Sequence, residues 1–261
     1  MTEDEWHELE NAVAASAPDR HVAAFFAPAQ RRRALVALYA FDNELAHVAG
    51  VVREPMLGHV RLAWWRQRLA AIYEGAAQQA PTAKALAKVV DAHKPPRALL
   101  DGLIDARAHD FDEAPFADEA AFERYADATE GNVMRLAVHI LGLAPLNEEV
   151  IRNVALAAAL GTQQSNAPRL ARQRRYRLPL TWLQAQGMNT EDIFANPDAV
   201  ARVMPQATQR IDQALATANR GRFRLGAMPV LSPATMARET GPAAPWRRFA
   251  RIAFANLTWR L

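Results

Sequence analysis

Hydrophobic residues recur at three- and four-residue intervals along most of the chain. This spacing places them on one face of an α-helix, whereas the alternating runs rich in Val, Ile and Thr that indicate strands are missing. Proline and glycine separate the periodic segments. The pattern therefore predicts an all-α protein. Helices are expected near residues 3–16, 30–51, 58–78, 83–93, 96–109, 118–142, 147–173, 197–221 and 245–260.

Several of these segments are longer than an average helix, which has about 11–12 residues. The links between them are short, and no internal repeat or change in composition divides the 261 residues. We therefore expect a single domain over residues 1–261, with long helices that surround a central cavity or pack into a solid bundle.

The amino-acid composition excludes several classes of protein and of functional site for this chain. The chain is 51% hydrophobic and 23% charged, which excludes a disordered protein, and it has no cysteine, which excludes disulfides, zinc–cysteine sites and thiol nucleophiles. Its net charge is +3, and all basic residues except Lys84, Lys88 and Lys94 are arginines. Arginine suits phosphate or carboxylate recognition, but alanine is also abundant, so a biased composition is the favoured explanation of the excess. No nucleic-acid-binding motif accompanies the arginines, and we expect no nucleic-acid partner.

The sequence shows neither an export signal nor a membrane span. The first residues are acidic and lack an apolar segment behind them, and the longest purely apolar run covers residues 154–160. A transmembrane helix needs about 20 apolar residues. We expect a cytoplasmic protein, with peripheral contact at the inner membrane as the alternative.

Two segments carry unusual polar patterns. In the segment 30–51, Asp42 interrupts an apolar stripe, and three arginines stand at the start, where the helix dipole repels cations. In the last segment, Trp246, Phe249, Ala253 and Leu257 share a face from which the neighbouring arginines point away. A final helix of this kind usually closes the core, and the alternative is that it lies on an anionic membrane.

Six segments carry recognisable motifs, at residues 33–41, 52–55, 61–66, 125–142, 161–169 and 175–179. Together they resemble the motifs of the squalene/phytoene synthase family over about residues 19–179. The resemblance implies a single-domain isoprenoid synthase fold, with long helices around a central cavity. It also implies substrate-binding positions, and arginine among them would hold an anion through paired hydrogen bonds. The candidate substrate-binding residues are Arg33, Tyr39, Arg53, Gln163, Asn166 and Arg169.

The chain departs from the family at the acidic motifs. Family synthases couple two prenyl diphosphates with Mg²⁺, which is held by carboxylates one turn apart on two facing helices. Here the first motif reads Ala46, His47 and Gly50, and Leu170 replaces an aspartate of the second, followed by an arginine-rich stretch at 172–175. We therefore predict no catalytic residue, no metal-binding residue and no cofactor, with Mg²⁺ required only in an active synthase.

These departures resemble a divergent branch of the family that contains the mitochondrial complex I assembly factor and its bacterial relatives. The resemblance implies a non-catalytic protein that acts in respiratory complex I assembly, with a complex I subunit as partner. Two alternatives to this function remain open. In the first, the chain is a prenyl-diphosphate head-to-head transferase. In the second, it binds a prenyl diphosphate or isoprenoid lipid without reaction.

Overall fold

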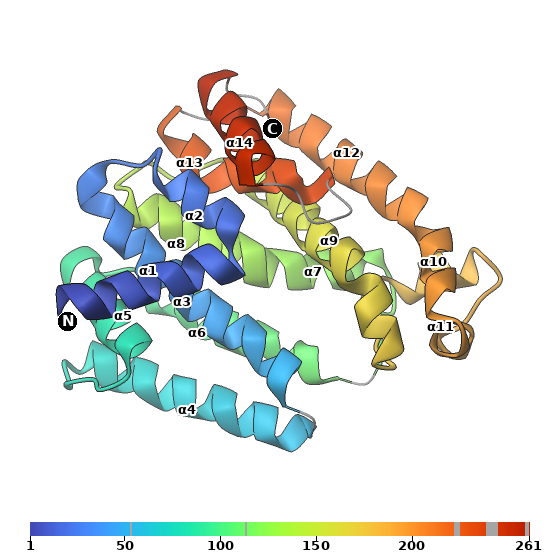
Figure 1. Ribbon diagram of the computed structural model, residues 1–261, viewed down its shortest axis with the longest axis horizontal. Coiled ribbons are helices and arrows are strands. Elements are labelled where there is room, and N and C mark those ends of the chain that lie inside the picture. Colours follow the sequence, from blue (N-terminus) through green and yellow to red (C-terminus); the bar gives the residue numbers. More distant parts are fainter. Residues whose placement is uncertain (53, 113, 222–224, 239–244, 259–260) are drawn as a thin grey trace.

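The computed structural model describes residues 1–52, 54–112, 114–221, 225–238, 245–258 and 261. Within these residues every regular element is a helix, so the all-α prediction is confirmed (Figure 1). No helix in this described part of the chain is both long enough and apolar enough to cross a membrane.

The long helices follow the predicted segments closely. The segment expected at 118–142 contains two α-helices joined by a π-helical turn, because hydrogen bonding shifts register there without breaking the helix. The α-helices are α1 (Glu3–Ser16), α2 (Pro18–Ala24), α3 (Ala29–Val51), α4 (Pro55–Tyr73), α5 (Pro81–His93), α6 (Arg97–Ala106), α7 (Glu119–Ala126), α8 (Asn132–Ile140), α9 (Glu148–Arg172), α10 (Leu180–Gln184), α11 (Thr190–Ala195), α12 (Met204–Arg220), α13 (Met228–Leu231) and α14 (Pro245–Thr258).

Short helical turns connect these elements. The proline- and glycine-rich region near residue 230 contains α13 between two such turns, rather than an irregular loop. The 3₁₀ turns are η1 (Arg107–Phe111), η3 (Pro197–Val203), η4 (Leu225–Ala227) and η5 (Ser232–Arg238), and the π turn is η2 (Asp127–Gly131).

Helix α9 passes through the middle of the molecule, where it packs against α12, η5 and η2 (Figure 1). Its N-terminus is capped by the side chain of Asn147, which accepts a hydrogen bond from the backbone N–H of Glu149. Helix α3 supplies the other large part of the core, including fully buried Leu35, Leu38 and Phe41. These two helices therefore form the frame that positions the cavity described below.

The last helix departs from the favoured prediction. The apolar face of α14 that includes Trp246 and Phe249 points to solvent, whereas Ile252 and Ala255 on its other side are buried. The expectation that this apolar face closes the core is therefore wrong. The reason is that Ile252 and Ala255 pack inward beside Arg248, which pairs with Asp19 at 2.5 Å, and these contacts together fix the rotation of the helix.

Candidate functional site

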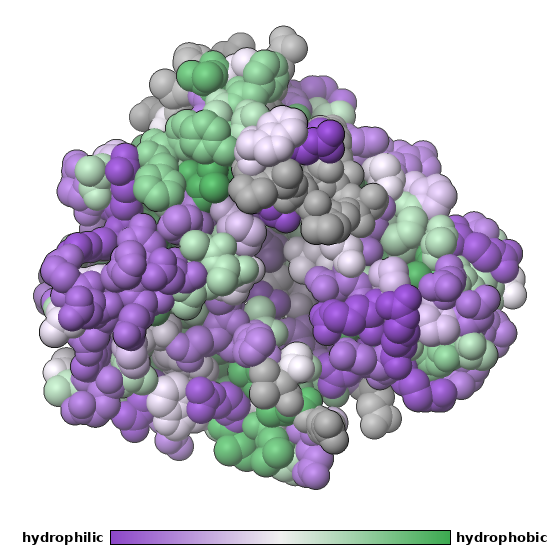
Figure 2. All heavy atoms as spheres, in the orientation of Figure 1, coloured by the Kyte–Doolittle hydropathy of each residue, from purple (hydrophilic) through white to green (hydrophobic). Residues whose placement is uncertain are grey.

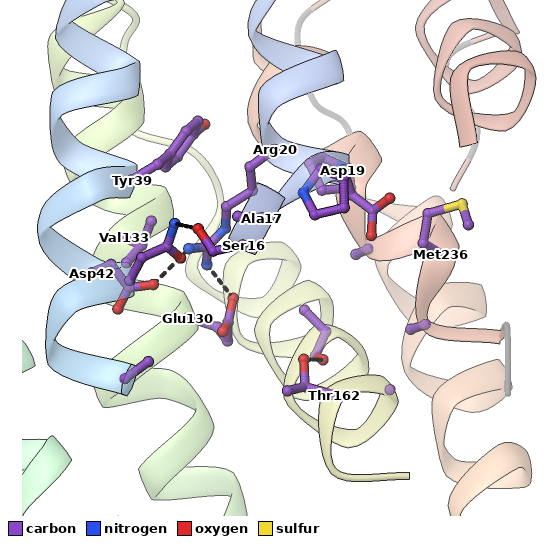
Figure 3. Close-up of a pocket in the computed structure, with 18 of the residues that line it drawn as sticks. Ser16, Ala17, Asp19, Arg20, Tyr39, Asp42, Glu130, Val133, Thr162 and Met236 are labelled. Atoms are coloured by element: carbon purple, nitrogen blue, oxygen red, sulfur yellow. Dashed lines mark hydrogen bonds and ion pairs between the residues drawn. The ribbon is translucent and has the colours of Figure 1, made fainter. Parts of the chain in front are cut away.

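A cavity of about 430 Å³ lies between α2, α3, α8, α9 and η5. Part of its wall is apolar, and Figure 3 shows that side chains from elements far apart in the sequence meet around it. The apolar lining includes Ala46, Val133, Met134, Ala137, Ala158 and Met236.

Charged side chains cross one wall of this cavity. One guanidinium nitrogen of Arg20 lies 2.6 Å from a carboxylate oxygen of Asp42, and the other lies 2.5 Å from a carboxylate oxygen of Glu130 (Figure 3). Arg107 donates from 2.9 Å to the second oxygen of Asp42. We call these four residues, Arg20, Asp42, Arg107 and Glu130, the guanidinium–carboxylate network.

The network extends away from the cavity through a tyrosine. Arg107 donates to the hydroxyl oxygen of Tyr125 over 3.1 Å, and this hydroxyl donates to Asp110 over 2.6 Å. Burial, with the nearby Asp110 carboxylate, raises the pKa of Tyr125 far above its usual value. Tyr125 therefore keeps its hydroxyl proton and can donate a hydrogen bond to Asp110.

Within the network, Asp42 and the two arginines favour each other's charged forms. Burial alone would raise the pKa of Asp42, but Arg107 and Arg20 outweigh it and keep that pKa below its ordinary value. Burial alone would lower the pKa of Arg20, but Glu130 and Asp42 raise it above the ordinary value. Beside them, burial raises the pKa of Tyr39 to about 12, and the Arg20 guanidinium lies 5.4 Å from the centre of its ring.

Local structure explains how these side chains converge. Arg20 stands on the short helix α2, whose first residue is Pro18, and Asp42 lies on the buried face of α3. Glu130 belongs to the π turn η2, where the altered helical register changes the direction of the side chains. Turns of this kind occur often at functional sites.

A third carboxylate lies at the edge of the cavity. Asp19 pairs with Arg248 of α14 at 2.5 Å. Burial raises the pKa of Asp19 above its ordinary value, although Arg248 opposes this effect. Each carboxylate that lines the described cavity, at Asp19, Asp42 and Glu130, therefore contacts an arginine.

The structure brings together two of the residues predicted to bind substrate. Tyr39 and Asn166 both line the cavity, on α3 and α9. Arg169 is exposed one turn beyond Asn166 and donates to its side-chain oxygen from 3.3 Å. Gln163 is half-buried on α9 and is not among the residues that line the cavity.

Of the other two predicted arginines, the structure describes only Arg33, which is not among the residues that line the cavity. Arg33 pairs with Glu3 and lies over the ring of Trp6, with its guanidinium carbon 5.5 Å from the ring centre. It is exposed and contacts α1 rather than the cavity. Arg53 lies outside the described residues.

The sequence-based interpretation missed Arg20, Arg107 and Glu130. One signal was available, since Asp42 interrupts an apolar stripe and a buried carboxylate requires a charged partner. The chain holds 31 basic residues, and nothing in their spacing distinguishes the two that reach Asp42. Only the packing of α2 and η1 against α3 identifies them.

The family resemblance implies a magnesium clamp made of carboxylates, and the carboxylates of this cavity are the groups that would have to form it. Mg²⁺ requires several free oxygen ligands in octahedral geometry, but guanidinium groups bind both carboxylate oxygens of Asp42 and one of Glu130. Ala46, at a position of the first acidic motif, adds only a methyl group to the cavity wall. Among the described residues, no group of three His, Asp or Glu side chains is placed to hold a metal ion. The residues present do not fit the clamp.

Solved structures show a similar fold. The chain aligns over 98% of its length with a squalene synthase of Alicyclobacillus acidocaldarius, and the alignment covers 94% of that synthase. The TM-score is 0.69 and the sequence identity is 17%. The chain aligns over the same share with a dehydrosqualene synthase, covering 97% of that chain, with a TM-score of 0.78 and 14% identity. The predicted isoprenoid synthase fold is thus confirmed.

Curated relatives divide into two groups. Assembly factor 6 of NADH dehydrogenase (ubiquinone) complex I from Bos taurus is 28% identical over 168 residues, which are 64% of this chain and 50% of that protein. A phytoene synthase from Rhodobacter capsulatus is 28% identical over 255 residues, which cover 92% of this chain and 71% of the relative.

The chain spans about half the length of the assembly factors it matches, and the human protein is similar to it at 27% identity over the same 168 residues. The family model of squalene/phytoene synthase matches residues 13–253, nearly the whole chain. The chain therefore belongs to the squalene/phytoene synthase family.

Proposed function

We propose that this chain is a non-catalytic member of its family that takes part in the assembly of respiratory complex I. The observation that carries the proposal is the guanidinium–carboxylate network, in which Arg20 occupies the space between Asp42 and Glu130. The similarity to the complex I assembly factors of several animals supports the assembly role.

The chemistry of the family requires a strong positive field at the departing diphosphate. Divalent metal ions normally supply it, because they bind phosphate oxygens and neutralise the leaving group. In this chain the two guanidinium groups of the network are already paired with Asp42 and Glu130, and that of Arg248 at the cavity edge is paired with Asp19. The network therefore leaves little net positive charge at this wall for ionising a diphosphate.

Two alternative functions each have an observation in their favour. The match to a phytoene synthase over 92% of the chain favours a prenyl-diphosphate coupling enzyme, for which Mg²⁺ would be the cofactor. The partly apolar cavity with Tyr39 and Asn166 favours a protein that binds a prenyl diphosphate or isoprenoid lipid without reaction. The proposed assembly role needs neither turnover nor metal.

The place of action follows from the proposed partner. Complex I is a membrane enzyme, so a protein that assists its assembly works at the face of that membrane. We propose that this chain is cytoplasmic, contacts the inner membrane peripherally and binds a complex I subunit.

Deletion of the gene tests the assembly role directly. We expect loss of assembled complex I on native gels and of NADH-driven respiration, whereas succinate-driven respiration stays unchanged. Reintroduced wild-type chain restores both signals. Normal complex I levels in the deletion strain would contradict the proposal.

Purified protein tests the absence of catalysis. We expect no coupled product from farnesyl or geranylgeranyl diphosphate with Mg²⁺, with an active family synthase as the positive control. Measurable turnover would establish the synthase alternative. Metal-independent binding of a farnesyl diphosphate analogue, weakened by Arg169→Ala, would instead support the binding alternative.

A further inference from the structure

Helix α14 presents an apolar face to solvent. The exposed fractions of Trp246, Phe249, Phe254 and Leu257 are 68%, 55%, 64% and 77%. At about 100° per residue, these four side chains fall on one side of the helix, together with alanines at two positions between them. A helix on the surface of a domain normally turns its polar side outward, so this orientation is the reverse of the usual one.

The contacts of α14 with the rest of the protein fix this orientation. Ile252 and Ala255 are buried, and Ile252 packs with Ala23 of α2 and Met236 of η5. The Arg248 guanidinium binds Asp19 at 2.5 Å. The inward side of the helix therefore combines a small apolar contact with an ion pair, and the larger apolar side is left on the surface.

A second segment extends the apolar surface. The ring of Phe26 lies 6.1 Å from that of Phe249, and the adjacent Phe25 is 49% exposed. Figure 2 shows hydrophobic side chains gathered over α14 at the top of the molecule. We call Phe25, Trp246, Phe249, Phe254 and Leu257 the α14 patch.

Arginines accompany the α14 patch. The guanidinium carbon of Arg247 lies 5.5 Å from the centre of the Trp246 ring, and that of Arg32 lies 5.7 Å from the centre of the Phe25 ring. Helix α14 has three arginines and no acidic residue in its sequence. Aromatic rings beside arginines, without carboxylates, are typical of helices that lie in the headgroup region of an anionic membrane.

We propose that the α14 patch docks the protein on an anionic lipid surface, with its aromatic side chains inserted among the headgroups and the adjacent, exposed Arg247 on lipid phosphates. Charge complementarity selects this occupant over a second copy of the chain. In a symmetric dimer through this face, the arginine-rich helix would meet itself without a carboxylate of its own to pair with. The inference rests on the proposed membrane location and names the surface responsible for it.

Vesicle sedimentation with the purified full-length chain tests this proposal. We expect the protein to sediment with vesicles of phosphatidylcholine containing 30% phosphatidylglycerol, roughly the anionic share that attracts basic segments, and to remain in solution with phosphatidylcholine alone. The double variant Trp246→Glu, Phe254→Glu should bind the anionic vesicles at least about tenfold more weakly, because charged side chains do not insert.

A matched control uses the other exposed apolar patch. Met56 and Val60 are 70% and 59% exposed on α4, a helix at the opposite end of the view from α14 in Figure 1. The variant Met56→Glu, Val60→Glu adds the same charge and should bind vesicles as the wild type does. Arg247→Glu, an exposed single change, should weaken binding several-fold without removing an apolar contact from the core.

Circular dichroism and melting confirm that the variants fold. The proposal is overturned by equal sedimentation with neutral and anionic vesicles, by absence of binding, or by equal losses in the α4 control. A dimer in light scattering that the Trp246 and Phe254 changes abolish would assign the patch to a second copy instead. Because vesicle binding is measured on isolated protein, its failure is distinguishable from failure of the assembly role, which is measured in cells.

Discussion

Asp42 is a buried carboxylate, and a buried carboxylate is stable in a folded protein only when positively charged side chains bind it. Its side chain is 2% exposed, and two guanidinium groups bind its two oxygens. Moving a lone carboxylate out of water costs several kcal/mol, and paired charges offset this cost only when both oxygens are satisfied. The network therefore depends on all of its members being present.

Replacing Asp42 by alanine leaves Arg20 and Arg107 without their shared counter-charge in a buried site. We expect Asp42→Ala to lower the free energy of unfolding by about 3–5 kcal/mol, measured by urea denaturation. Asp105 is the control, since it pairs with Arg66 on the surface, where its side chain is 65% exposed. Asp105→Ala should cost less than about 1 kcal/mol, and equal losses in the two variants would contradict the argument.

The lowered pKa of Asp42 also predicts a dependence on pH. The pKa of aspartate in an unfolded chain is about 3.9. Below that pH the unfolded chain binds a proton at Asp42 that the folded chain still excludes. The stabilisation from Asp42 is thus fully present above about pH 4 and is lost as pH falls through its folded pKa.

Urea unfolding of the wild type and of Asp42→Asn between pH 6 and pH 2.5 measures this effect. The free-energy difference between the two proteins should shrink as the solution becomes acidic. Asp19, whose pKa is raised by burial, contributes a slope of opposite sign in both proteins, so it cancels in the difference. A difference that stays constant down to pH 2.5 would show that the pKa of Asp42 is the same in the folded and unfolded states, which would contradict the argument.

At the scale of helices, one close approach holds the C-terminal region against the centre of the molecule. A Cβ atom added at Gly161 of α9 would lie 2.5 Å from the Cα atom of Ala237 in η5. Backbone atoms cannot yield as a side-chain end can. The helix and the turn can therefore pack at this distance only because position 161 is glycine.

We expect Gly161→Ala to lower the free energy of unfolding by about 1–3 kcal/mol, because the added methyl group must push η5 away from α9. Gly50 in α3 is the matched control, with no atom within 4 Å of an added Cβ. Gly50→Ala should stabilise the protein by about 0.5–1 kcal/mol through helix propensity alone. Thermal melting of both variants measures the contrast, and a stabilised Gly161→Ala would refute the close approach.

Across the whole molecule, arginines have different neighbours along the cavity wall and on the outer surface of α14. Carboxylates and arginines neutralise one another along the wall of the central cavity, at Asp19, Asp42 and Glu130. On the surface of α14, arginines accompany aromatic rings instead. The fold shared with the synthases is thus combined with a cavity wall whose carboxylates are paired with arginines and an outer face that we propose contacts anionic lipid.

The sequence by itself determined the helical class, most helix positions and the family, because helix periodicity and short motifs are local properties of the chain. The resemblance also identified Tyr39 and Asn166, which share the cavity wall. It did not identify the network, since the partners of Asp42 stand 22 and 65 residues away and contact it only after the helices pack.

The tertiary structure alone decided which way the apolar stripe of α14 faces. The repeat of three and four residues shows that Trp246, Phe249 and Leu257 share a side, but it contains no information on what lies opposite. The buried contacts of Ile252 and Ala255, together with the Arg248–Asp19 ion pair across 229 residues, determine that direction. A stripe that the sequence favoured for the core thereby becomes the surface proposed to meet the membrane.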